Sequence, residues 1–330
     1  MTGWWLGYDI GGTRLKSAVV YESGTLDRME VVDTEHEHFS HTWQRMLAMG
    51  RSAVEATGDG LSGVGVALPG LVDTEFGSRH LPGKVIGIED FPLRERLESE
   101  FCVPVRCVND GAAAALAEWR FGVAQGYADV VGITIGTGVG CGVINAGRLL
   151  TSGNLGAGVS FGHATIPSGG RTCLCGNIGC AETLVSADAV TGRLRDYLER
   201  NVPSVLREAY LADPRSIAFQ SLIEGVRADD RVCLEVLADF RRDLGALTVT
   251  AIHAFDPEVV VLAGGPLAAS DHFLPHVQQY VDRYAFVYPK HRRVPVLRAR
   301  LEHHAGVLGA VALVISAVED TGVAAARGTT

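Results

Sequence analysis

Two glycine-rich turns, each set between a pair of apolar segments, constrain the fold of this chain more than any other feature. The first turn is Gly11-Gly12-Thr13 and the second runs from Gly136 to Gly140. An apolar run, a short glycine turn and another apolar run predict a β-hairpin, because glycine adopts tight turns without steric cost. The two hairpins share one layout and predict two related lobes, with strands at Trp4–Ile10, Leu15–Tyr21, Val130–Ile135 and Cys141–Asn145.

Helices and strands alternate along the rest of the chain, which predicts an α/β protein. Apolar residues recur at helical spacing over residues 39–57, and an alanine-rich helix is expected at 112–120. Residues 187–251 are largely helical in pattern, and the last helix is expected at 306–318 with a frayed end to Thr330. Further strands are expected at residues 64–68, 103–108 and 258–263.

Length and charge exclude some classes of protein. The 330 residues are enough for two lobes with their own cores. The formal net charge of −9 argues against a protein that binds nucleic acid phosphates, because such binding requires clustered Lys and Arg. No apolar run reaches the ~20 residues of a membrane helix, and the flanks of a signal peptide are missing. We therefore expect a cytoplasmic protein with no nucleic-acid or membrane partner.

Three glycine turns form a candidate nucleotide site: Asp9 to Thr13, Gly136 to Gly140, and Ala263-Gly264-Gly265. Glycine lets the backbone approach an anion, and the N–H groups of such turns can point at phosphate oxygens. One glycine turn alone usually just connects two strands. Neither a Walker A loop nor a Rossmann glycine motif is present. The order of the three turns resembles the phosphate-1, phosphate-2 and adenosine segments of the actin, hexokinase and Hsp70 ATPase superfamily.

That resemblance implies two ribonuclease-H-like lobes, the actin-like ATPase fold, with nucleotide and sugar in the cleft between them. Asp9 would position Mg²⁺ through its water ligands, and Lys16 would add positive charge nearby. The β- and γ-phosphates of ATP would face Gly11, Gly12 and Thr13 on one lobe and Gly136, Thr137 and Gly138 on the other. Gly264 and Gly265 would lie along the adenosine.

A candidate general base follows a buried strand. Asp110 stands at the start of the alanine-rich helix, with Asn109 beside it to orient a substrate by hydrogen bonding. A hydroxyl attacks a phosphoryl group well only if a nearby group accepts its proton. An isolated Asn-Asp pair at a helix start is more often a helix cap. Beside the phosphate loops, however, residues 108–112 resemble the Asn-Asp-x-x-Ala signature of sugar kinases, which favours the base.

A compact cysteine motif predicts a structural zinc site. Cys173, Cys175 and Cys180 lie within eight residues that also include two glycines. Tetrahedral zinc needs a fourth ligand, which His163 can supply. The alternative is three buried cysteines without a metal. In a reducing compartment, clustered cysteines indicate metal binding before disulfide formation.

With these motifs in order, the chain from residue 4 to about residue 315 resembles the ROK family of repressors, open reading frames and kinases. The family pattern Glu-x-Gly-His followed by Cys-x-Cys-Gly-x-x-Gly-Cys-x-Glu matches residues 160–163 and 173–182 apart from its first residue. The resemblance implies that His163 binds zinc with one ring nitrogen and faces the sugar with the other. It also implies that Glu182 contacts the sugar near C1 and C2. Gly138 is expected to face the substrate as well as ATP.

The match breaks where the family has a glutamate, because Ser160 stands there. A loosely aligned asparagine of the family corresponds to His80. A pocket that loses a carboxylate changes its preference among substrates that differ in their hydroxyl groups. We expect phosphorylation of a primary hydroxyl, the 6-OH, of a hexose, an amino sugar or a cyclitol. Glucokinase is the commonest activity in the family, whereas Ser160 favours an aminodeoxy sugar.

The expected lobes are residues 1–115 with 307–330, and residues 116–306 with a zinc insert at 163–182. A homodimer is expected from the resemblance. Two other functions stay open: a sugar-sensing regulator, and a catalytically inactive sugar-binding protein. Family regulators carry a helix-turn-helix before the first strand, whereas this sequence enters that strand at Trp4. Retention of Asp9, Asn109 and Asp110 argues against an inactive protein.

Overall fold

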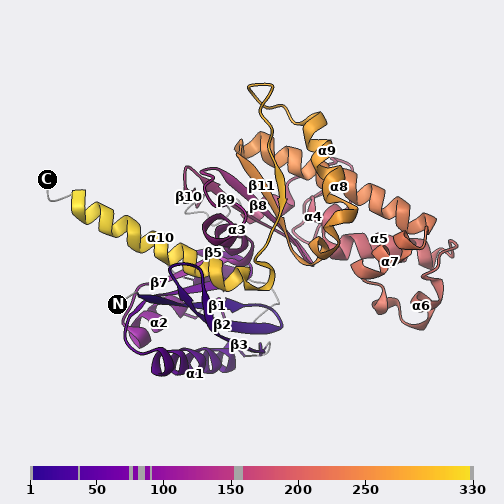
Figure 1. Cartoon of the computed structure of the whole chain (residues 1–330). Coiled ribbons are helices and arrows are strands. Elements are labelled where there is room, and N and C mark those ends of the chain that lie inside the picture. Colours follow the sequence, from indigo (N-terminus) through magenta and orange to yellow (C-terminus); the bar gives the residue numbers. More distant parts are fainter. Residues whose placement is uncertain are drawn as a thin grey trace. The chain divides into compact units, whose positions relative to one another are not determined.

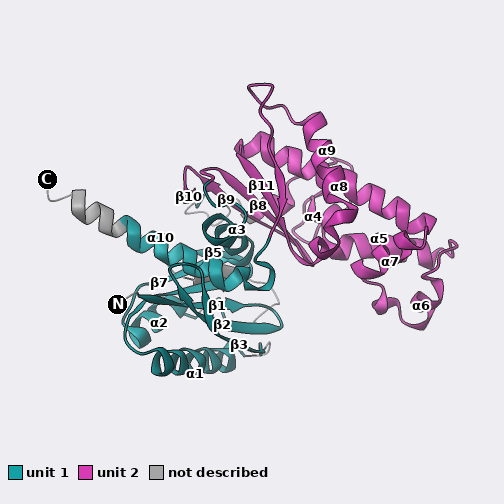
Figure 2. Cartoon of the chain, in the orientation of Figure 1, with its two compact units in different colours: residues 1–126, 149–159, 300–330 teal, residues 127–148, 160–299 magenta. Residues whose placement is uncertain are grey.

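The computed structural model describes residues 3–35, 38–73, 77–80, 86–89, 91–151 and 159–327 (Figure 1). Within these ranges, the side chains of residues 77–80, 159 and 321–327 are not described. The chain divides into two compact units (Figure 2). Unit 1 comprises residues 1–126, 149–159 and 300–330, and unit 2 comprises residues 127–148 and 160–299. The predicted lobes, with boundaries at residues 115 and 306, stay a prediction.

Unit 1 is built on a five-stranded mixed sheet of order β3-β2-β1-β4-β7. The predicted first hairpin forms its centre, and β1 pairs antiparallel with β2 while both β4 and β7 run parallel to β1. Strands β1 and β4 are mostly apolar and buried, which suits the centre of a sheet covered on its faces, whereas β3 at the edge is largely polar and exposed. The bounds are β1 Trp4–Ile10, β2 Arg14–Tyr21, β3 Leu26–Asp33, β4 Leu61–Leu68 and β7 Val105–Asn109, with the small β5 Leu71–Asp73 and β6 Gly77–His80 pair beside them.

Helices α1 Phe39–Thr57, α2 Leu93–Phe101, α3 Asp110–Phe121 and α10 Ala305–Arg327 complete unit 1. Helix α10 lies directly on α3 and on the sheet, and glycines make this approach possible. A Cβ at Gly309 would lie 1.8 Å from the carbonyl oxygen of Ala113 in α3, and one at Gly65 in β4 would lie 2.2 Å from the carbonyl oxygen of Ala310. The helix backbones are therefore in direct contact, with no room for intervening side chains.

One buried carboxylate connects the segment where the chain first leaves unit 1 with the segment where it last returns to it. Glu118 in α3 is only 1% exposed. Its Oε2 accepts from the Val123 N–H at 2.9 Å, and its Oε1 accepts from the Arg300 and Leu301 N–H groups at 2.7 and 2.6 Å. A buried charge is tolerated when it is hydrogen-bonded in this way. The segments after α3 and before α10 therefore share one anchor.

Unit 2 repeats the strand arrangement of unit 1, in the order β10-β9-β8-β11-β12. Strand β8 pairs antiparallel with β9, and β11 runs parallel to both β8 and β12. Each unit thus has a hairpin followed by parallel strands, which confirms the predicted relation between the two halves. The bounds are β8 Val130–Ile135, β9 Val139–Asn145, β10 Arg148–Leu149, β11 Val259–Ala263 and β12 Val296–Arg298.

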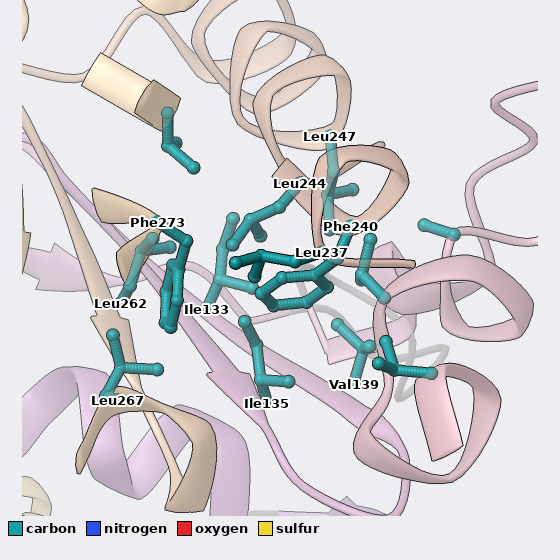
Figure 3. Packing of buried hydrophobic residues seen from close by; sticks show 14 of the residues in the cluster. Ile133, Ile135, Val139, Leu237, Phe240, Leu244, Leu247, Leu262, Leu267 and Phe273 are labelled. Atoms are coloured by element: carbon teal, nitrogen blue, oxygen red, sulfur yellow. The ribbon is translucent and has the colours of Figure 1, made fainter. Parts of the chain in front are cut away.

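The core of unit 2 lies between this sheet and the long helix α8. Phe240 of α8 and Phe273 meet edge to face, with ring centroids 5.1 Å apart, and Ile135 and Val139 from the ends of the β8–β9 turn join the same cluster (Figure 3). The helices are α4 Glu182–Val185, α5 Ala187–Glu199, α6 Arg207–Ala212, α7 Phe219–Arg227, α8 Arg231–Phe255 and α9 Leu274–Tyr284, and the 3-10 helices are η1 Val159–His163, η2 Pro214–Ser216, η3 Gly265–His272 and, in unit 1, η4 Glu302–His304.

The predicted α/β class is confirmed, and most predicted elements lie within a few residues of their expected bounds. The last helix is an exception, because α10 continues to Arg327 instead of ending at residue 318. The alanines of this segment favour helix strongly enough to extend it. Over the described part of the chain, no helix combines the length and apolar character that crossing a membrane requires.

Candidate functional site

In unit 1 the predicted acidic residues meet at one edge of the sheet. Strands β1, β4 and β7 are parallel, so their carboxyl ends lie at the same edge. Asp9 in β1 and Val108 in β7 both stand opposite Ala67 in β4. Two strand spacings separate the backbones of Asp9 and Val108, which is about 10 Å. The register therefore brings Asp9 close to Asn109 and Asp110, which follow directly after Val108.

Asp9 is a partly buried carboxylate with a cation beside it. Its side chain is 15% exposed, and its Oδ2 accepts from the Lys16 Nζ at 2.8 Å. The Lys16 ammonium also donates to the carbonyl oxygen of His303 at 3.2 Å. At Gly306, in the first turn of α10, a Cβ would lie 2.4 Å from the Asp9 carboxyl carbon. The N-terminal end of α10 thus lies against the Asp9 carboxylate.

The turn between β1 and β2 is closed by its own backbone. The Gly11 N–H donates to the Arg14 carbonyl at 2.9 Å, and the Thr34 hydroxyl donates to the Gly11 carbonyl at 2.9 Å. The Gly11 N–H is thus used to close the hairpin. A Cβ at Gly12 would have no neighbour within 4 Å, and Thr13 is exposed. Of the three predicted phosphate contacts in this turn, Gly12 and Thr13 are the accessible ones.

Asn109 caps helix α3. Its Oδ1 accepts from the N–H groups of Gly111 and Ala112 at 2.9 and 3.2 Å, and its Nδ2 donates to the Gly70 carbonyl at 2.8 Å. The helix-cap interpretation therefore describes Asn109, and its contact with a sugar stays a prediction. Asp110 is exposed at the first position of α3, where its Oδ1 accepts from the Gly111 N–H at 2.8 Å.

Two predicted substrate residues lie beside segments that are not fully described. The backbone of His80 pairs with Leu71, next to the Gly70 carbonyl that Asn109 binds, but its side chain lies outside the described residues. Ser160 is exposed in η1. Residues 152–158 of the glycine-rich segment before it also lie outside the described residues.

In unit 2 the two remaining glycine segments lie side by side. The parallel strands β8 and β11 end in register, with Thr134 opposite Ala263. Gly136–Gly138 and Gly264–Gly265 follow directly after these ends. Gly264 has a φ of +105°, and a Cβ there would lie 1.9 Å from the Ile135 carbonyl oxygen. Glycine is therefore required at this position both by its conformation and by the close approach.

The cysteine motif folds as a compact knuckle in unit 2. Isolated bridges pair Thr165 with Cys180 and Thr172 with Ile178. The knuckle turns at Gly176, where φ is +90°, and at Gly179, where φ is +77° and a Cβ would lie 1.9 Å from the Pro167 carbonyl oxygen. Both glycines are thus needed for the turn that returns Cys180 to the other ligands.

The four predicted zinc ligands come together. One donor atom from each of His163, Cys173, Cys175 and Cys180 lies within 4.8 Å of all the others. The His163 Nδ1 is 3.6 Å from the Cys173 Sγ, and the Cys175 and Cys180 Sγ atoms are 3.6 Å apart. Tetrahedral zinc with ordinary Zn–S and Zn–N bonds separates its ligand atoms by about 3.4 to 3.8 Å.

The residues therefore fit a zinc ion in number, type and spacing. Three thiolates and one imidazole favour zinc over Mg²⁺ or Ca²⁺, which prefer oxygen ligands. Burial raises the pKa of the Cys180 thiol to about 12, and a bound cation would offset this effect by favouring the thiolate.

Glu182 lies between the knuckle and the glycine turn of β8 and β9. Its Oε2 accepts from the Val139 N–H at 2.9 Å. Its Oε1 is 3.9 Å from the Cys173 Sγ. The family resemblance implied a sugar contact for Glu182. The hydrogen bond between Glu182 and the backbone of this turn was not anticipated from the sequence.

A sequence profile described as the ROK family matches residues 5–317. The chain belongs to the ROK family. The match covers both units and all the predicted site residues. Ser160 lies within the matched range, and its replacement of a family glutamate stays a prediction.

Relatives within the ROK family include both kinases and regulators. The chain is 31% identical over 313 residues to a glucokinase of Halalkalibacterium halodurans, which covers 93% of each chain. It is similar to the crystal structure of a ROK glucokinase from Streptomyces griseus in complex with glucose and AMPPNP, at 28% identity and a TM-score of 0.76, covering 94% of this chain and 99% of that one. It is also similar to a ROK transcriptional regulator, a homologue of the E. coli Mlc protein, at 25% identity and a TM-score of 0.81, covering 94% and 78% of the two chains.

Sequence reasoning also missed two contacts of Asp9. Lys16 pairs with Asp9 because the two residues stand opposite each other in the β1–β2 hairpin, a register that the turn position could have indicated. Gly306 lies against Asp9 although the two residues are far apart in the chain, and no local pattern signals this contact.

Proposed function

We propose that this ROK protein is an ATP-dependent kinase that transfers the γ-phosphoryl group of ATP to a hydroxyl of a sugar. Glucokinase relatives that match the chain over almost its whole length support this activity. The observation that carries the mechanism is the shared sheet edge in unit 1, where Asp9 near the end of β1 and Asp110 just after β7 belong to parallel strands on either side of β4. One carboxylate can serve the metal of MgATP and the other the proton of the hydroxyl.

Asp110 is the proposed general base. Its exposed position at the start of α3 lets it meet a substrate hydroxyl. The hydroxyl oxygen forms a bond to the γ-phosphorus as the bond from that phosphorus to the β,γ-bridging oxygen breaks. The hydroxyl proton passes to Asp110, and ADP leaves. We propose the primary 6-OH as the nucleophile, since it projects from the sugar ring and is less hindered than the secondary hydroxyls attached directly to the ring.

Asp9 and its neighbours are proposed to serve the phosphates and Mg²⁺. Asp9 would hold water ligands of Mg²⁺, and Gly12 and Thr13 would face the β- and γ-phosphates. Lys16 is held near this place by Asp9 and by the His303 carbonyl. Its ammonium would partly neutralise the charge that the phosphates bring.

Unit 2 is proposed to supply the remaining ATP contacts through Gly136–Gly138 and Gly264–Gly265, which lie at adjacent strand ends. His163, Cys173, Cys175 and Cys180 would hold the structural zinc, which when bound would order the wall that carries His163. Glu182 and His163 are proposed sugar contacts in this unit. A homodimer stays a prediction.

The substrate is proposed to be a hexose, an amino sugar or a cyclitol, with an aminodeoxy sugar favoured by Ser160. A serine offers one neutral hydroxyl where the family glutamate offers a charge and two acceptor oxygens. A sugar hydroxyl that donates to that carboxylate would lose its acceptor. The pocket would therefore disfavour ordinary glucose relative to a substrate whose groups suit serine.

Replacing the proposed base tests the mechanism. Asp110→Asn keeps the size of the side chain and an oxygen that can accept from the Gly111 N–H, but it cannot take up a proton. We expect kcat to fall by roughly 10²-fold or more, with a smaller change in the KM for sugar. Coupled ADP release measured over a range of sugar concentrations separates the two quantities.

Two further variants make this experiment specific. Asp59→Asn changes an exposed aspartate before β4 in the same way and should leave kcat and KM unchanged. Asn109→Ala should weaken sugar binding and also destabilise the protein by about 1 kcal/mol, because it removes the cap of α3. A wild-type rate for Asp110→Asn would refute the role of Asp110 as base and leave the pair as a helix cap.

A sugar-responsive regulator without kinase activity is the second candidate. The structural similarity to a ROK regulator favours it, as does the loss of the glutamate at Ser160. ATP consumption measured over a panel of hexoses, amino sugars and cyclitols distinguishes the two. A kinase consumes ATP with at least one member of the panel, whereas a regulator binds a sugar without doing so.

A further inference from the structure

We infer that Glu182 is a positioning residue for the Gly136–Gly138 loop, and that it sets the affinity for ATP independently of any contact with sugar. This inference rests on the proposed function, in which that loop binds the phosphates. It adds a role in nucleotide binding to a residue whose expected partner is the sugar.

The loop is a short hairpin turn whose two ends are fixed in the core. Strand β8 ends at Ile135 and β9 begins at Val139, and both side chains belong to the buried cluster of unit 2 (Figure 3). The Gly136 N–H donates to the Gly138 carbonyl at 2.9 Å and closes the turn. A small shift of either end would therefore move all three loop residues.

Three later segments of unit 2 hold this turn in place. The Ala187 N–H, at the start of α5, donates to the Gly136 carbonyl at 2.8 Å. Gly162 lies so close that a Cβ there would be 2.3 Å from the Val139 carbonyl oxygen. The third contact is the Glu182 Oε2, which accepts from the Val139 N–H at 2.9 Å. Among these three contacts, only the one from Glu182 is made by a side chain.

Gly138 shows how closely the carboxylate approaches the turn. A Cβ at Gly138 would lie 2.5 Å from the Glu182 Oε2 and 3.3 Å from its carboxyl carbon. Gly138 is not among the glycines of positive φ, so its backbone conformation alone does not require glycine. The position of Glu182 explains the absence of a side chain at Gly138 without reference to a phosphate.

The placement of Glu182 depends in turn on the knuckle. Cys180 precedes it by two residues, and the Ala181 N–H donates to the Ala164 carbonyl at 2.9 Å, next to His163. The proposed metal ligands and the anchor of the nucleotide loop thus belong to one short, continuous piece of structure. A carboxylate bonded to a backbone N–H is a strong, directional contact, which suits a positioning role.

Nucleotide binding without sugar tests the inference. The affinity of the full-length protein for a fluorescent, non-hydrolysable ATP analogue with Mg²⁺ is measured for the wild type, Glu182→Ala, Glu182→Gln and Gly138→Ala. Glu182→Ala should weaken binding by about tenfold, as expected for one lost charge-assisted hydrogen bond. Glu182→Gln retains an acceptor oxygen and should stay within about threefold of the wild type. Gly138→Ala should weaken binding to a degree similar to Glu182→Ala, because its new methyl group displaces the carboxylate.

The double variant, with both Glu182→Ala and Gly138→Ala, tests whether the two residues affect ATP binding through one shared contact or independently of each other. Once Glu182 is alanine, Gly138→Ala has no carboxylate to displace, and its additional effect should shrink to less than about threefold. Two variants in α5 serve as controls: Glu199→Ala removes an exposed carboxylate, and Gly192→Ala adds a methyl group where no atom lies within 4 Å. Both should bind the analogue like the wild type.

Each outcome decides between the proposals. If the wild type binds the analogue and Glu182→Ala binds it equally well, the positioning role is refuted while the proposed kinase stands. Fully additive effects of Glu182→Ala and Gly138→Ala would also refute it. A wild type that does not bind the analogue refutes the proposed kinase, and with it the inference.

Discussion

The contact between α10 and α3 makes a sharp prediction for Gly309→Ala. A Cβ at this position would lie 1.8 Å from the Ala113 carbonyl oxygen and 2.4 Å from its carbon. The two helices would have to move apart by roughly 1.5 Å before this contact became an ordinary one. The methyl group would meet backbone atoms of Ala113, and its own position is fixed by the backbone of residue 309, so no side-chain rotation can relieve the clash.

The magnitude follows from two opposing effects. Overpacking a core costs about 1–3 kcal/mol, and a backbone collision belongs at the upper end of that range. Alanine is favoured over glycine in a helix interior by about 1 kcal/mol. We therefore expect Gly309→Ala to lower the free energy of unfolding by about 2 kcal/mol. Gly192→Ala in α5 makes the same change in open space and should raise it by about 0.5 to 1 kcal/mol.

Tryptophan fluorescence during urea unfolding can report this effect for unit 1 alone. All four tryptophans of the chain, Trp4, Trp5, Trp43 and Trp119, lie in unit 1. Gly309→Ala should lower the urea midpoint of the tryptophan signal, whereas Gly192→Ala should raise the stability of unit 2 followed by circular dichroism. If Gly309→Ala is as stable as the wild type in the tryptophan signal, the helices are not in the direct contact described here.

Two further predictions concern specificity and the metal. Ser160→Glu should raise kcat/KM for glucose relative to the preferred sugar of the wild type, and an unchanged ratio between the two sugars would contradict the role of Ser160. Elemental analysis of freshly purified protein should find one zinc per chain. A thiol reagent should then label the exposed Cys102 and, after chelation, also the exposed Cys175. It should not label Cys107, Cys141 or Cys233, because burial raises the pKa of each of these thiols to about 12. Protein that lacks zinc as purified, or in which Cys175 is labelled equally before chelation, would count against the metal site.

Local patterns were sufficient to predict most of the fold. The first strand was expected at the residues where β1 lies, and the helix over residues 39–57 corresponds to α1. These elements depend on the alternation and periodicity of apolar residues, which are visible in any short window. The repeated hairpin also predicted that the two halves are related, as their matching strand orders confirm.

The details of the site depended on contacts between distant residues. Glu118 stands in an alanine-rich helix where a glutamate would ordinarily face solvent, yet it is buried and binds the backbone of Arg300 and Leu301. Glu182 reaches the N–H of a residue 43 positions away. Such contacts arise from how whole elements pack, and no spacing in the sequence signals them.

Residues with two possible roles were also hard to resolve from sequence. Asn109 suits both a substrate contact and a helix cap. In the structure its side-chain oxygen accepts hydrogen bonds from N–H groups at the start of α3. Both roles use the same amide, so the pattern alone could not separate them. The cysteine motif was easier, because few arrangements other than a metal site bring three thiols and an imidazole so close together.

The division of unit 1 along the sequence has a consequence for synthesis on the ribosome. Residues 1–126 emerge first, but the face of β4 and α3 that α10 covers is not closed until residues 305–320 have been made. Until then Glu118 also lacks two of its three backbone partners. Unit 2 is continuous in the sequence from residue 160 to residue 299, so its core can be complete before α10 has been made. We therefore expect the segment made first to be the last to reach its native structure, with an apolar face that a chaperone could bind in the interval.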